Sequence, residues 1–97
     1  MMQPYKRVSE TMWEWREGSR QFSVRVFKST CKLIWSSWIE SANGPVYDDG
    51  VGQTFEAFLR GEGLPTTPPK PVLDEVTVLV QGVMGGKRTN ALAWLQG

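Results

Sequence analysis

Two stretches near the N-terminus alternate between apolar and polar residues. From Val8 to Arg16, Trp13 and Trp15 fall on one face, and from Gln21 to Phe27 the residues Phe22, Val24 and Val26 share a face. A period of two is typical of a half-buried strand, and β-branched and aromatic residues favour strands. The pattern therefore predicts two strands, joined by a turn at residues 17–20, where Gly18 supplies the positive φ of a hairpin turn.

A third strand is predicted from Cys31 to Ser41, after a connection at residues 28–30. Both of its faces are partly apolar: one carries Leu33, Trp35 and Ile39, and the other Lys32, Ile34 and Trp38. A strand apolar on both sides is expected to be central or covered twice. The breakers at residues 43–45 end it. Residues 5–41 are thus predicted to form a three-stranded meander, with little pattern before Val8.

The chain changes to a helical period after residue 48. Residues 48–50 offer N-caps, and the spacing of Val51, Phe55, Phe58 and Leu59 predicts a helix over 51–60. The prolines of residues 64–71 then predict a stiff, extended connector. Its two PxxP matches, Pro65–Pro68 and Pro68–Pro71, also fit an SH3-type ligand, but a crossover is the simpler interpretation.

The C-terminal third is ambiguous by pattern alone. Residues 72–83 carry valines and leucines at helical spacing, with a proline before them and two acids in the predicted first turn, although residues 76–80 also suit a strand. We expect a helix there, ended by Gly85-Gly86. Residues 87–95 alternate weakly and are predicted to be a returning strand, although residues 91–95 are also helix formers.

These elements predict an α+β fold. We expect an antiparallel sheet of three to four strands with two helices packed on one face, in the order β-β-β-α-α-β, and a single domain over residues 1–97. We find no internal repeat, and no motif carries a resemblance to a known family.

Charge and cysteine usage refine the setting. The net charge is +1, but residues 1–40 are mainly basic and residues 41–75 mainly acidic. The two parts are expected to complement each other. The lone Cys31 cannot form an internal disulfide and is expected to be a buried structural thiol. No apolar run suits a signal peptide or a membrane span, so we expect a cytoplasmic protein.

The absence of histidine excludes most familiar chemistry within one chain. Neither a Ser-His-Asp nor a Cys-His device can form, nor a zinc site of cysteine and histidine. Residues 48–50 are too short for a calcium loop, and residues 82–89 are one residue short of a phosphate-binding loop and have Arg88 at its hydroxyl position. We therefore expect no enzyme, no cofactor and no metal.

Large aromatic rings and cations remain as candidate binding residues. Opposite the face that Val24, Val26 and Leu33 bury, the chain places rings among basic side chains. The predicted binding residues are Phe27, Trp38, Arg25, Lys32 and Trp35. We expect a non-catalytic interaction or ligand-binding module, a homodimer that uses this aromatic sheet face. The alternative is single-stranded nucleic acid, with bases stacked on the rings. An apolar small ligand is a further candidate.

Overall fold

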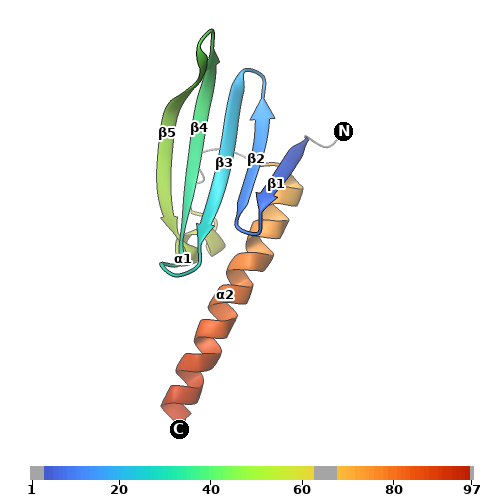
Figure 1. Cartoon of the computed structure of the whole chain (residues 1–97). Coiled ribbons are helices and arrows are strands. Elements are labelled where there is room, and N and C mark those ends of the chain that lie inside the picture. The colour runs from blue at the N-terminus through green and yellow to red at the C-terminus, as the bar shows by residue number, and fades with distance from the viewer. Residues whose placement is uncertain (1–3, 63–67, 97) are drawn as a thin grey trace.

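The computed structural model describes residues 4–62 and 68–96, with side chains up to residue 85. Five strands form one antiparallel sheet in chain order, so each strand pairs with its neighbours in sequence (Figure 1). The strands are β1 (Tyr5–Ser9), β2 (Met12–Glu17), β3 (Arg20–Phe27), β4 (Lys32–Ser41) and β5 (Gly44–Thr54). The predicted α+β class and the three predicted strands are confirmed. The sheet gains one more strand at each edge.

The two edge strands have no clear sequence pattern because little of either is buried. All five residues of β1 are exposed, so no contact with the core requires apolar side chains at alternate positions there. At the other edge, β4 turns directly into β5 through a hairpin in which Ser41 pairs with Gly44, whose φ is +103°. The breaker cluster at residues 43–45 is therefore a hairpin turn, not the end of the sheet. The order β-β-β-α-α-β is wrong for this reason.

The first helix is shorter than predicted. Residues 51–54 belong to β5, and α1 (Phe55–Leu59) begins after Thr54, whose Oγ1 accepts a hydrogen bond of 3.1 Å from the backbone N–H of Ala57. Thr54 is thus the N-cap, whereas Asp48 and Asp49 lie inside β5. The apolar stripe still has its predicted effect, because Phe55 and Phe58 are buried.

The segment whose pattern fitted both helix and strand is helical. Helix α2 (Lys70–Gln96) buries Val72, Val76 and Val80, which are spaced four apart and therefore lie on one side of the helix. The two acids at 74–75 come after its first turn, because the helix starts at Lys70. Pro71 fits within the first turn, where a missing N–H removes no helical hydrogen bond.

Helix α2 also continues where a stop and a strand were predicted. Its backbone passes through Gly85-Gly86 and residues 87–95 and ends at Gln96, so both predictions are wrong. Helix formers at residues 91–95 follow the two glycines, each of which costs only about 1 kcal/mol in a helix. The segment 82–89 is therefore helix rather than a phosphate-binding loop. Figure 1 shows that the C-terminal half of α2 runs past the end of the sheet.

The proline-rich connector lies partly outside the described residues. Residues 63–67 are among those not described, which leaves the Pro65–Pro68 match open. Pro68 and Pro69 are buried, and the Pro69 carbonyl accepts the first helical bond of α2 from the N–H of Leu73. The Pro68–Pro71 match is thus partly buried and partly helical, which does not suit an exposed SH3 ligand.

One face of the sheet and the two helices enclose the core. The fully buried side chains come from β2, β3, β4, α1 and α2, and the largest of them are Trp13, Trp35, Phe55 and Leu33. Trp15 stacks on Phe22 at 5.8 Å and meets the edge of Trp35 at 6.4 Å. We call this covered side of the sheet the inner face, and the opposite side the outer face.

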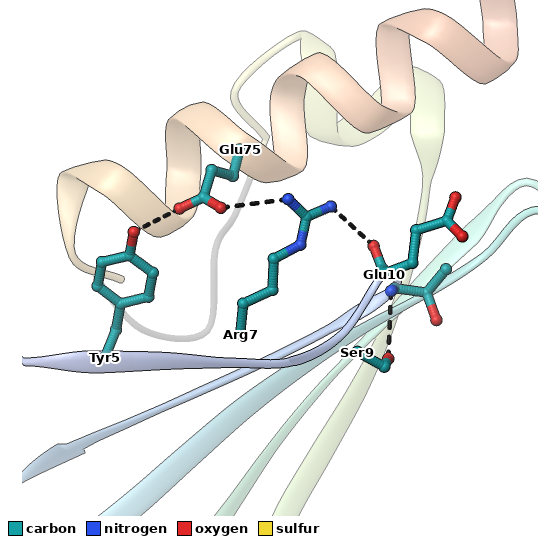
Figure 2. A network of polar contacts seen from close by, with 6 residues as sticks. Tyr5, Arg7, Ser9, Glu10 and Glu75 are labelled. Carbon is teal, nitrogen blue, oxygen red and sulfur yellow. Dashed lines mark hydrogen bonds and ion pairs between the residues drawn. The ribbon is translucent and has the colours of Figure 1, made fainter.

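Polar contacts join β1 to α2 at the edge of the inner face (Figure 2). The Tyr5 hydroxyl donates a 2.6 Å hydrogen bond to Glu75, and Arg7 forms a 3.3 Å ion pair with the same carboxylate. The bond to Glu75 raises the pKa of Tyr5 above its ordinary value. The Arg7 guanidinium also lies 4.7 Å from the centre of a Trp13 ring. Together with the 2.8 Å pair of Arg20 and Asp48, these contacts join the basic N-terminal part to the acidic part, as expected.

A side-chain contact also links the β1–β2 turn to the β3–β4 turn. Lys28 forms a 2.5 Å ion pair with Glu10, which lowers the pKa of that carboxyl group. Cys31 follows in the same β3–β4 turn, with a left-handed φ of 56°. It is half-buried, and its Sγ lies 3.7 Å from the Lys28 carbonyl oxygen. Cys31 is therefore a turn residue at the margin of the core, not a fully buried strand thiol.

Candidate interaction surface

The register of β3, β4 and β5 decides which residues share the outer face. Directly opposite residues of an antiparallel pair point to the same side. Phe27 lies opposite Lys32, Arg25 opposite Ile34, and Trp38 opposite Tyr47. Because the neighbouring residues Val26, Leu33 and Trp35 are buried on the inner face, these six side chains belong to the outer face. None of the described helices covers them (Figure 1).

One end of the outer face combines apolar and cationic side chains. Phe27 is 36% exposed and Ile34 is 41% exposed, and Arg25 and Lys32 are exposed beside them. The Arg25 guanidinium lies 3.4 Å from the Sδ of Met12 on β2. This arrangement brings an aromatic ring, an aliphatic side chain and two cations within one strand pair.

The other end of the outer face carries an aromatic pair. The rings of Trp38 and Tyr47 meet edge to face, with centres 6.0 Å apart and an angle of 75° between their planes. Tyr47 is 60% exposed, and its hydroxyl lies over Gly50, where a Cβ atom would overlap it. A bulge in β5 at this point shifts the register between Ser37 and Trp38. The glycine and the bulge together allow the Tyr47 ring to lie along the strand.

The two ends are separated by a row of small residues. Ser23, Ser36 and Gly50 lie opposite one another across β3, β4 and β5. Trp38 is six residues farther along β4 than Lys32, the partner of Phe27, which is about 20 Å at the rise of a strand. Phe27 and Trp38 thus share a face but do not touch. Lys32, rather than a tryptophan of β4, lies directly opposite Phe27.

Trp35 does not belong to the outer face. It is only 2% exposed, its ring contacts Trp15 and Phe58 in the core, and its Nε1 donates a 2.9 Å hydrogen bond to Gln53. The prediction that Trp35 joins the surface is therefore corrected: Trp35 lies two residues after the buried Leu33 in β4, so both side chains are on the inner face. The other four predicted residues, Arg25, Phe27, Lys32 and Trp38, are brought to one face.

Sequence reasoning missed two parts of this surface. Tyr47 was overlooked because β5 was taken for the approach to a helix. A signal was present, since the Asn43-Gly44 turn that follows a strand is typical of a hairpin. Glu40 was also missed; its carboxylate pairs with Arg16 at 2.8 Å, with both side chains about half exposed (52%). The outer face therefore carries both charge signs at its Trp38 end.

Elsewhere in the molecule the candidate sites are weaker. A hollow of about 80 Å³ lies on the inner face beside Trp35 and Val51, where Arg20 and Ser37 both bond to Asp48. Within residues 4–62 and 68–96 we find no cluster of three or more metal-ligating side chains of the His, Cys, Asp and Glu types. None of the helices in the same ranges is long and apolar enough to span a membrane.

We compared the chain with models of protein families, with curated proteins and with solved structures, and none of the three comparisons found a match. The proposals below therefore rest on the geometry of this chain alone.

Proposed function

We propose that this protein is a small non-catalytic interaction module that forms a homodimer through its outer face. The observation that carries the proposal is the exposure of large apolar side chains on a sheet face that the described helices leave uncovered. Phe27, Ile34 and Tyr47 are exposed there, and Trp38 is half-buried beside them. Aromatic residues with arginine at the margin are enriched where protein interfaces gain most of their affinity.

The size of the chain supports the same proposal. A domain of about 100 residues buries a smaller fraction of its surface than a larger one, so covering a second apolar face by association adds substantially to its stability. The edge strand β5 is a poorer contact, because its bulge, Pro45 and the neighbouring Asp48 and Asp49 disfavour pairing of two such edges. The face, rather than the β5 edge, is therefore the expected contact.

The test is the mass of the protein in solution. Analytical ultracentrifugation at micromolar concentrations is expected to show a species of about twice the 11.0 kDa monomer. Trp38→Glu and Phe27→Glu should shift it toward the monomer. Val78→Glu is the matched control, because Val78 is 70% exposed on α2 and lies away from the outer face. A monomer at every concentration would refute the proposal.

Single-stranded nucleic acid is the second candidate partner for the same face. Phe27 beside Lys32, with Arg25 on the same strand, supplies a stacking ring next to two cations. Among the described tryptophans, Trp38 is the one not buried, so bound bases should quench its fluorescence. The quenching should weaken as salt rises, because phosphate contacts release counterions. Absence of quenching by a short oligonucleotide at low salt would eliminate this candidate.

An apolar small ligand has less support. The hollow beside Trp35 has about 80 Å³, whereas ligand sites usually have about 300 Å³ or more. A larger hollow of about 560 Å³ is open to solvent and lined mainly by polar and charged side chains, which include Lys6, Glu14 and Glu40, so it does not suit an apolar ligand. We also propose a cytoplasmic location, which rests on the single cysteine, because one thiol cannot form the internal disulfides that are common in oxidising compartments.

A further inference from the structure

The outer face of β4 and β5 is arranged symmetrically about one row of small residues. Ser36 and Gly50 form that row. Two residues farther along β4 in one direction, the row of Trp38 and Tyr47 is bulky, and two residues in the other direction, Ile34 lies beside the bare Gly52. Nothing lies within 4 Å of the position that a Cβ at Gly52 would take. The large pair Trp38–Tyr47 and the smaller pair Ile34–Gly52 thus lie at equal distances on either side of the Ser36–Gly50 row.

Charge follows the same symmetry. Glu40 and Lys32 each lie four residues from Ser36, on the same strand and the same face, and both are exposed. They are about 26 Å apart within one chain at the rise of a strand, too far to interact with each other. A rotation of 180° about the Ser36 row would place each of them over the position of the other.

We infer that two copies pack outer face on outer face around a twofold axis that runs across the strands through this central row. The inference rests on the proposed homodimer and specifies its geometry. Trp38 and Tyr47 of one copy then lie over Ile34 and Gly52 of the other, and Lys32 of each lies over Glu40 of the other. Large side chains meet small ones, as close packing of two sheets about 10 Å apart requires.

A twofold axis parallel to the strands gives poorer side-chain packing and poorer charge pairing. An axis parallel to the strands would place Trp38 near Trp38 and Lys32 near Lys32, which sets bulk against bulk and like charge against like charge. In the favoured arrangement the central row also includes Glu14 and Lys6 on β2 and β1. Lys6 and Glu14 lie opposite each other within each copy, so every cation near the axis has an anion beside it.

The area of the outer face indicates how tightly the two copies are expected to bind. Five strands about 4.8 Å apart, over the 26 Å or so between Lys32 and Glu40, give a flat footprint of roughly 500 Å² per copy. Typical stable interfaces bury about 800 Å² per partner. We therefore expect a dissociation constant in the micromolar range. Phe27 lies toward the margin of this contact and Trp38 near its centre, so Trp38→Glu should weaken the dimer more than Phe27→Glu.

A charge exchange tests the arrangement directly. Lys32→Glu and Glu40→Lys should each raise the dissociation constant about tenfold or more, because each sets like charges opposite each other in the dimer. Glu40→Lys also breaks the pair of Glu40 with Arg16 within one chain, and that loss is the same in the single and the double variant. The double variant Lys32→Glu/Glu40→Lys should restore it to within about threefold of the original, since the opposite charges are exchanged between copies. Restoration cannot arise inside one chain, where the two residues are remote. Lys70→Glu, at the exposed start of α2, is the matched control and should change nothing.

The outcomes separate this inference from the proposed function. A dimer that Trp38→Glu dissociates, but that the double variant leaves as weak as the single ones, would overturn the axis and keep the outer-face dimer. A dimer unaffected by Trp38→Glu, or a monomer at all concentrations, would overturn both. Restoration in the double variant supports both. Circular dichroism of each variant establishes that it is folded before its mass is compared.

Discussion

The hydroxyl of Tyr47 lies over the α-carbon of Gly50, in the space that a side chain at position 50 would occupy. Only glycine therefore allows the Tyr47 ring to lie along β5 and meet the edge of Trp38. The aromatic end of the outer face depends on this glycine.

Gly50→Ala should displace Tyr47 from Trp38. The tip of the tyrosine can turn into solvent, so the expected loss of folding stability is only about 1 kcal/mol, the size of one aromatic pair. The fluorescence and near-UV circular dichroism of Trp38 should change. Gly52→Ala is the control, because a Cβ there meets nothing within 4 Å in the monomer. Both should be measured at concentrations that keep the protein monomeric. Identical spectra for Gly50→Ala and the original protein would contradict the contact.

Val76→Ala in α2 should destabilise the fold by about 2 kcal/mol, because it removes two buried methyl groups and leaves a cavity between helix and sheet. Val76 is fully buried, whereas Val78, two residues away, is 70% exposed. The same substitution at Val78 should be nearly neutral. Urea unfolding of the two variants provides the measurement. Equal losses would show that α2 does not pack on the sheet through this side.

The contact of Tyr5 with Glu75 predicts a dependence on alkaline pH. The bond raises the pKa of Tyr5, so the protonated form is favoured in the folded state. Its contribution to stability is present below the pKa of an unfolded tyrosine, about 10, and is lost as pH rises through the raised value. The thermal unfolding midpoint should exceed that of Tyr5→Phe at pH 8, and the difference should disappear at higher pH. A difference that is constant with pH would argue against the bond.

The left-handed backbone at Cys31 predicts an inversion of the usual preference for larger apolar side chains. Burial alone would favour Cys31→Val over Cys31→Ala, because valine covers more of the adjacent core. A φ of 56° is costly for a β-branched residue, however, so Cys31→Val should be the less stable of the two by about 1 kcal/mol. Chemical denaturation of both variants decides the matter. A more stable valine variant would mean that the turn does not hold this conformation.

Alternation of residues was sufficient to predict β2 and β3, and the apolar residues on both faces of β4 predicted a central strand. Trp15, Phe22 and Val24 alternate with polar neighbours because these strands bury one face, and burial is what imposes a period of two. The same logic assigned Arg25, Phe27, Lys32 and Trp38 to the outer face. It also predicted the helical stripe that buries Val72 and Val76, because that side of α2 packs on the core.

The sequence by itself thus determined the fold class, the central strands, the side of the sheet that most of their residues occupy and the absence of histidine chemistry. Only the tertiary structure revealed the two edge strands and the register of the sheet, because neither depends on buried side chains. The exposed strand β1 and the glycine-rich β5 are held by backbone pairing with their neighbours, which any residue except proline can make. The opposition of Trp38 and Tyr47, and the symmetric rows around Ser36, follow from the register of that pairing.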